Sequence, residues 1–274
     1  KEKMIVRLGE SPSQIKHLSE SAIHRGVEAM ELFRQIADRH GSPIRAVATS
    51  AVREASNGEE FIERVRETTG IEIEVVSGFE EARLIYLGVM QALPAYNRRI
   101  ALFDIGGGST EISCHESGLL INESVNIGSV RLTEMFFQNG YSGEAILRAL
   151  EFIIEHLDRL PLSAKGKSLV GVAGTLTTLS AIRLELKEFD IGKVHGDLVT
   201  LSEVSEITER LIGLNEQERL SIGSYMKGRS DIIVSGALIL RELMKKLESG
   251  SVKISARGLR YGLMLKLDAF SKSS

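Results

Sequence analysis

Short apolar segments alternate along this chain with amphipathic helical patterns, and this alternation limits the fold more than any other feature of the sequence. Apolar runs predict strands over 44–48, 71–76, 100–103, 169–172 and 252–254. Apolar residues at helical spacing, together with capping signals, predict helices over 23–40, 57–70, 77–89, 146–157 and from 215 onward. Strands that alternate with helices indicate an α/β protein.

Composition narrows the class of protein further. The chain has 274 residues and a formal net charge of −3, with no basic block, so a general nucleic-acid binder is not expected. The single cysteine, Cys114, excludes an intramolecular disulfide and is expected to be a small buried residue. No apolar run approaches the roughly 18 residues of a membrane span, so we expect no membrane partner and a cytoplasmic location.

The most informative segment of the sequence is a glycine-rich loop that follows an apolar strand. Asp104 and Ile105 precede Gly106, Gly107 and Gly108, and Ser109, Thr110 and Glu111 follow them. Glycines allow backbone N–H groups to approach a phosphate, hydroxyls can donate to phosphate oxygens, and Asp104 could hold a divalent cation. A tight hairpin without a ligand is the alternative that this segment leaves open.

Two further strand ends carry similar residues. One apolar strand runs into Ala173-Gly174-Thr175, and another runs into Thr49-Ser50-Ala51-Val52-Arg53. In open α/β sheets, ligands bind beyond the carboxyl ends of strands, so the three loops together predict a site for a polyanion. A Walker loop is excluded because Pro161 stands where its first glycine is needed, and the six histidines show no zinc spacing.

Two adjacent acids begin a predicted helix after Ser77. Glu80 is three residues from Ser77 and completes a capping box, which leaves Glu81 without a capping task. Both acids favour the positive end of the helix, which is a sufficient reason for their presence. The alternative is that Glu81 is a general base that activates water beside a bound phosphate.

These segments, in this order and spacing, resemble the exopolyphosphatase/guanosine pentaphosphate phosphohydrolase family (Ppx/GppA). The resemblance covers nearly the whole chain and rests on the segments 48–55, 77–84, 104–111, 174–175, 193–196 and 258–260. It implies an actin-like (ribonuclease H-like) α/β fold of two domains with an interdomain cleft. A break at 93–97 predicts domains over 1–97 and 98–274, with the C-terminal helix as a candidate to return to the first domain.

The resemblance also implies roles for individual residues. Glu81 resembles the catalytic base, and Asp104 and Glu111 resemble acids that organise Mg²⁺ or Mn²⁺. The implied phosphate-binding residues are Thr49, Ser50, Arg53, Gly106, Gly107, Gly108, Ser109, Thr110, Gly174, Thr175 and Arg229. Arginine suits this task because its planar fork binds phosphate bidentately.

The sequence departs from the family pattern in two places. Family members carry a strand and a first phosphate loop before the Arg7-Leu8-Gly9 segment, so we expect Met4–Leu8 to be the third strand of an incomplete first-domain sheet, with an open gap facing Gly106–Gly108. Ala256 and Tyr261 stand where many members have Asp and Glu. We also expect the chain to be of the family's short type, which lacks the extra C-terminal helical domains of long members.

The expected reaction is hydrolysis of a terminal phosphoanhydride, with inorganic polyphosphate or guanosine pentaphosphate as substrate and a role in the stringent response. Two alternatives stay open, a polyphosphate- or alarmone-binding regulator without hydrolysis and an actin-like small-molecule kinase. The oligomeric state is also open, with a homodimer as one option.

Overall fold

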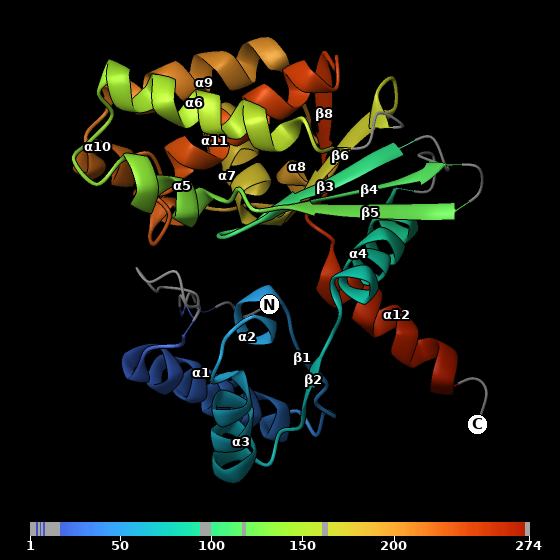
Figure 1. Cartoon of the computed structure of the whole chain (residues 1–274). Helices are drawn as coiled ribbons and strands as arrows, with labels where there is room; N and C mark the ends of the chain where they lie inside the picture. The colour runs from blue at the N-terminus through green and yellow to red at the C-terminus, as the bar shows by residue number, and fades with distance from the viewer. Residues whose placement is uncertain are drawn as a thin grey trace. The chain divides into compact units, whose positions relative to one another are not determined.

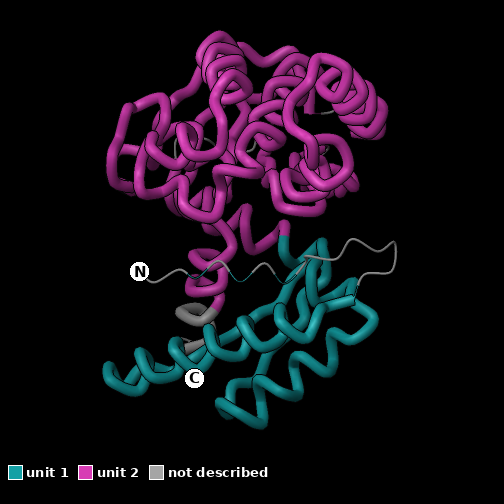
Figure 2. The backbone as a smooth tube through the Cα atoms, turned by 90° about the vertical axis from the view of Figure 1, so that its left-hand side faces the viewer, with its two compact units in different colours: residues 1–81 teal, residues 82–274 magenta. Residues whose placement is uncertain are grey.

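The computed structural model describes Met4, Val6, Leu8 and residues 17–93, 100–116, 119–160 and 164–271, with side chains up to residue 266. The chain divides after Glu81 into two compact units, which Figure 2 colours separately. This division lies within helix α4 (Gly78–Ala92), earlier than the expected boundary at 97/98. Residues 94–99, which hold most of the expected break, lie outside the described part of the chain.

The first unit combines helices with a two-stranded parallel sheet. Its elements are α1 (Glu20–Arg39), β1 (Ala46–Ala48), α2 (Ser50–Arg53), α3 (Gly58–Thr69) and β2 (Ile73–Val75). Ala46 pairs with Ile73 in the sheet, and the core is built from buried apolar residues such as Ile23, Phe61 and Val65. Met4, Val6 and Leu8, the described part of the expected third strand, belong to no strand.

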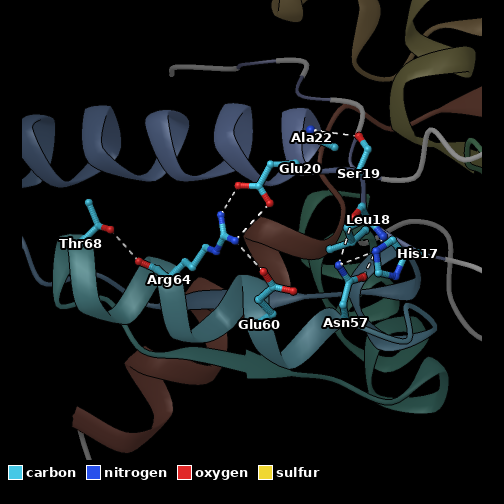
Figure 3. Close-up of polar contacts among 9 residues, drawn as sticks. All are labelled: His17, Leu18, Ser19, Glu20, Ala22, Asn57, Glu60, Arg64 and Thr68. Carbon is cyan, nitrogen blue, oxygen red and sulfur yellow. Dashed lines mark hydrogen bonds and ion pairs between the residues drawn. The ribbon is translucent and has the colours of Figure 1, made fainter.

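Polar contacts join α1 to α3 on the surface of the first unit (Figure 3). Arg64 of α3 donates to Glu20 of α1 and, at 2.6 Å, to Glu60 one turn earlier in its own helix. The Arg64 and Glu20 side chains are exposed, so solvent screens these ion pairs and they add little to the free energy of unfolding.

Asn57 has a different role from the predicted one. The sequence predicts that its side chain caps α3, but it makes no such bond. Instead, the Leu18 N–H donates to Asn57 Oδ1 at 2.8 Å, and Asn57 Nδ2 donates to the Leu18 carbonyl at 3.0 Å (Figure 3). The amide therefore holds the segment before α1 against the start of α3.

The second unit is built on a mixed sheet with the strand order β5-β4-β3-β6-β8-β7. The central strands β3, β6 and β8 are parallel, and the neighbouring pairs on both sides are antiparallel. The strands are β3 (Ile100–Ile105), β4 (Thr110–Glu116), β5 (Leu119–Val125), β6 (Ser168–Val172), β7 (Leu198–Thr200) and β8 (Ser251–Ile254).

Helices cover both faces of this sheet (Figure 1). Phe103 and Ile105 of β3 point into the large core under the helices α5, α6, α7, α9 and α11. Ile100 and Leu102 alternate to the other face, where they pack with Ile85 and Val89 of α4. The helices of the second unit are α5 (Ser129–Phe136), α6 (Gly143–Leu157), α7 (Ala173–Arg183), α8 (Ile191–Val194), α9 (Leu201–Gly213), α10 (Glu216–Leu220), the 3-10 helix η2 (Ser224–Met226), α11 (Ile233–Lys246) and α12 (Leu259–Ser271).

Glycines let α4 and α12 pack backbone against backbone. A Cβ added to Gly262 of α12 would lie 1.8 Å from the carbonyl oxygen of Leu84, and one added to Gly88 of α4 would lie 2.5 Å from the carbonyl oxygen of Gly258. The C-terminal helix therefore contacts the part of α4 that the sequence assigned to the first domain, although both belong to the second unit. Among the described residues, no helix combines the length and the apolar character needed to cross a membrane.

Candidate phosphate site

The glycine loop between β3 and β4 is held by the first turn of α5. The Ser129 N–H donates to the Gly106 carbonyl at 2.9 Å, and the N–H groups of Val130 and Arg131 donate to the Gly107 carbonyl at 2.9 and 3.0 Å. The Gly108 carbonyl accepts a bond of 2.8 Å from Arg131 Nε. Three consecutive loop carbonyls thus accept donors from α5, and those of Gly106 and Gly107 satisfy backbone N–H groups that the start of a helix leaves without partners.

This arrangement decides where the loop amides point. In a trans peptide the C=O of one residue is antiparallel to the N–H of the next. The N–H groups of Gly107, Gly108 and Ser109 are therefore directed away from α5, and they have no acceptor among the described residues. Successive amides that point the same way form an anion-binding concavity.

Gly128, just before α5, makes this packing possible. A Cβ at this position would lie 2.4 Å from the Gly107 carbonyl carbon and 2.5 Å from the Gly108 nitrogen. A side chain here would displace the backbone of the loop, so the sequence of β5 and α5 shapes a loop that lies about twenty residues earlier in the chain.

The second glycine loop lies beside the first, because β3 and β6 are adjacent parallel strands and Asp104 pairs with Val172. Thr175, in the first turn of α7, is buried, and its hydroxyl donates to the Ile105 carbonyl at 3.3 Å. Ala173, where β6 turns into α7, has φ of 68°, a conformation that L-residues rarely adopt. Backbone strain of this kind concentrates at ligand sites.

Arg229 brings a positive charge to this second loop. Its guanidinium fills the space above Gly174, where a Cβ would lie 2.0 to 2.3 Å from the guanidinium atoms. Burial lowers the pKa of Arg229 from its ordinary value, and no described carboxylate pairs with it. An arginine with no counter-charge among the described residues, at the N-terminus of α7, favours a bound anion.

Asp104 and Glu111 face each other across β3 and β4. They are directly opposite in the antiparallel register, so both carboxylates lie on the same face of the sheet. Glu111 accepts hydrogen bonds from the hydroxyls of Ser109 (2.5 Å) and Ser124 (3.1 Å). The described residues contain no group of three acids or histidines placed to hold a metal. Two carboxylates fit Mg²⁺, which keeps several waters and takes phosphate oxygens as further ligands.

Besides Thr175, two predicted side chains have structural partners instead of free hydroxyls. Thr110 is fully buried, and its hydroxyl donates to the Ile127 carbonyl at 2.7 Å. The Ser109 hydroxyl donates to Glu111, so this serine orients an acid of the neighbouring strand. Ser109 belongs to the loop and Thr110 begins β4, and the side chains of both hold the loop in place.

The remaining predicted residues lie in the first unit. Thr49 precedes α2, Ser50 begins it, and Arg53 ends it. Arg53 Nη1 donates to the Val76 carbonyl at 2.8 Å and to Glu81 Oε2 at 3.3 Å. Only 14% of the Glu81 side chain is exposed. The Ser77 hydroxyl accepts the Glu80 N–H at 3.2 Å, as the predicted cap requires.

The predicted residues thus form two groups, one in each unit. Gly106, Gly107, Gly108, Ser109, Gly174, Thr175 and Arg229 lie together at the carboxyl ends of β3 and β6, with Asp104 and Glu111 beside them. Arg53 and Glu81 form the second group, with Thr49 and Ser50 at the other end of α2. Glycine loops at adjacent ends of parallel strands, on a sheet covered by helices on both faces, define an α/β protein with a candidate phosphate site at the edge of its sheet.

Comparison with known proteins makes the assignment specific. Residues 1–269 match the model of the Ppx/GppA phosphatase family, and the chain belongs to this family. Exopolyphosphatase 2 of Mycobacterium tuberculosis is 30% identical over 97% of this chain and 88% of its own length. A bifunctional 3-dehydroquinate synthase/phosphatase of Fusobacterium nucleatum is 34% identical over 96% of this chain, which spans only 41% of that longer protein.

Solved structures agree with this family and with the predicted fold class. The Aquifex aeolicus member of the Ppx/GppA family has a TM-score of 0.80 and 28% identity, and the match covers 99% of this chain and 89% of that one. An exopolyphosphatase from Cytophaga hutchinsonii has a TM-score of 0.87 and 26% identity, with 96% and 86% covered.

Sequence reasoning missed Arg131, whose side chain contacts the glycine loop. The helix that positions it, α5, was not among the predicted helices, so the sequence offered no signal for this contact.

Proposed function

We propose that this chain is a phosphohydrolase that releases the terminal phosphate of inorganic polyphosphate. The observation that carries the proposal is the set of three amides at Gly107, Gly108 and Ser109, directed away from α5 because α5 and Arg131 take the preceding carbonyls. Arg229, whose guanidinium lies over Gly174 of the neighbouring loop, supports it with a positive charge that has no described counter-ion. The family and the exopolyphosphatase relative support the same substrate class.

The two groups of residues have different roles in the proposed reaction. Water forms a bond to the terminal phosphorus while the bridging P–O bond breaks, and the bridging oxygen leaves with the shortened chain. Glu81 takes the proton of the attacking water, and the Arg53 guanidinium, 3.3 Å away, holds that carboxylate in one orientation. The loop amides and Arg229 stabilise the charge on the equatorial oxygens of the phosphoryl group.

A divalent cation fits the pair of Asp104 and Glu111. Mg²⁺ would supply charge neutralisation at the phosphate oxygens. Glu111 is oriented for such a role by the hydroxyls of Ser109 and Ser124, which donate to its Oε1. We propose Mg²⁺ or Mn²⁺ as the cofactor, guanosine pentaphosphate as a second substrate, and the cytoplasm as the location.

Three substrates separate this function from its alternatives. The full chain is incubated with long-chain polyphosphate, with guanosine pentaphosphate, and with ATP plus candidate acceptors, each with Mg²⁺, and free phosphate and ADP are measured. We expect free phosphate from polyphosphate without ATP. Binding of polyphosphate without phosphate release would contradict hydrolysis and favour a regulator, and ADP formation that depends on an acceptor would favour a kinase.

A further inference from the structure

Arg131 has the features of a ligand-binding residue that the proposed reaction does not use. Its Nε donates to the Gly108 carbonyl at 2.8 Å, which fixes the plane of the guanidinium at the loop. Nη2 lies 3.8 Å from the position that a Gly108 Cβ would occupy. The two Nη groups have no acceptor among the described residues, so their four N–H donors are available at the edge of the loop.

The location of this arginine has an electrostatic cost that calls for a counter-charge. It lies in the first turn of α5, where the helix dipole disfavours a cation, and this turn contains no acid. Its only described side-chain partner is a neutral carbonyl. A bound anion beside Gly108 would offset the unfavourable helix dipole and would give the guanidinium a charged partner.

Arg131 and the loop amides present different donors to a ligand. The amides of Gly107, Gly108 and Ser109 converge on one anionic group, whereas the free edge of Arg131 lies beside the loop. A ligand with a single phosphate is satisfied by the amides. A ligand with two consecutive phosphates can place the second one against the arginine fork.

We propose that Arg131 binds the phosphate next to the one held by the loop amides, and so selects ligands with at least two linked phosphates. This inference takes from the proposed function only that the glycine loop binds phosphate. It concerns binding and does not depend on hydrolysis. The ligand that Arg131 would select is a linear chain of phosphates joined by anhydride bonds.

Equilibrium binding to the full chain in excess chelator, where the proposed hydrolysis does not run, tests the proposal, with tripolyphosphate and orthophosphate as the probes and calorimetry as the readout. Arg131→Ala is expected to weaken tripolyphosphate binding about 10- to 100-fold, the loss of a charge-assisted hydrogen-bonded pair, and orthophosphate binding less than about threefold. Arg148→Ala is the matched control. Arg148 belongs to α6, and its guanidinium lies over the ring of Phe136 at the C-terminal end of α5, so the variant removes the same charge away from the loop. We expect it to change neither affinity.

Arg131→Lys separates a ligand contact from a brace for the loop. A lysine can still donate to the Gly108 carbonyl but then lacks the free fork, so we expect tripolyphosphate affinity to stay well below that of the wild type. Full recovery by lysine, equal losses for the two probes in Arg131→Ala, or a wild type that binds no tripolyphosphate would each overturn the proposal. A wild type that binds tripolyphosphate without hydrolysing it would refute the proposed function and leave this inference standing.

Discussion

The lack of a side chain at Gly174 leaves room in the candidate site for another residue. The Arg229 guanidinium occupies the volume that a Cβ on Gly174 would need. The atoms in conflict are the far end of a flexible side chain, so an alanine here pushes the guanidinium aside and leaves the fold intact. The substitution therefore weakens ligand binding and leaves the stability of the fold unchanged.

Gly174→Ala is therefore expected to lower kcat/KM for polyphosphate about 10- to 100-fold, because a charge-assisted hydrogen bond is lost. The melting temperature should change little. Gly143→Ala at the start of α6, where no atom lies within 4 Å, is the control and should change neither quantity. A large drop in melting temperature for Gly174→Ala would show that Arg229 cannot move as this account requires.

Gly128 acts at the scale of the element, because it lets α5 approach the loop. Its added Cβ would collide with backbone atoms of Gly107 and Gly108, which cannot move without displacing the loop. Gly128→Ala should lower the free energy of unfolding by about 1–3 kcal/mol and weaken phosphate binding as well. Chemical denaturation and calorimetry measure the two effects, with Gly213→Ala at the end of α9 as a neutral control. Unchanged phosphate affinity would contradict the role given to the loop.

His195, after α8, links the segment that follows β8 to its own loop. The Ala256 N–H donates to His195 Nδ1 at 3.3 Å. Burial, together with the charges of Arg257 and Lys253, lowers the pKa of His195, and a hydrogen bond with the Ala92 backbone opposes this only in part. The folded protein therefore favours the neutral ring, whose Nδ1 can accept.

The pH dependence follows from the direction of this shift. Between the folded pKa and the unfolded value near 6.5, the unfolded state binds more protons, so stability rises with pH in that window. Its contribution is complete above the unfolded pKa and is lost as pH falls through the folded one. His195→Gln should flatten the fall in melting temperature from pH 7 to pH 5, whereas exposed His40→Gln should not. An unchanged slope in His195→Gln would refute this assignment.

The sequence predicted the central elements because their signals are local. Apolar runs located β3, β6 and β8, and the left-handed Gly70 ends α3 as expected. The capping box of Asn215 and Glu218 is present. The strands β5 and β7 were missed, since β5 is half exposed and β7 has only three residues.

The site was predicted in its composition but not in its geometry. The glycines at 106–108 and 174 predicted two loops. Nothing near them in the sequence indicates that Ser129, Val130 and Arg131 donate hydrogen bonds to the carbonyls of the first loop. Asn57 shows the same limit, because its local pattern fits a cap while a tertiary contact with Leu18 takes its amide. Long-range hydrogen bonds decide these cases, and a local pattern cannot contain them.

At the scale of the whole molecule, the two units carry different candidate residues. The second unit carries the glycine loops, Arg229 and the two acids, and the first carries Arg53 and Glu81. The family assignment spans both units, and so does the match to the Aquifex aeolicus structure.

Dependence on a divalent cation is expected of the whole protein. Excess chelator should abolish phosphate release, and Mg²⁺ should restore it. Asp104→Asn should raise the Mg²⁺ concentration needed for half-maximal rate, because one of two carboxylates is lost. The rate measured over a Mg²⁺ titration tests this, with Asp158→Asn, on the surface at the end of α6, as the control. Full activity in chelator would exclude the metal role.

The most direct test of the central claim is the rate of phosphate release from tripolyphosphate by the wild type, Glu81→Gln and Glu80→Gln. Loss of a general base should slow Glu81→Gln about 10²- to 10⁴-fold while tripolyphosphate still binds. Glu80→Gln should keep its rate and lose at most about 1 kcal/mol of stability, since Glu80 lies in the first turn of α4 and has no part in the proposed reaction. A Glu81→Gln variant as fast as the wild type, or a wild type that releases no phosphate, would contradict the account.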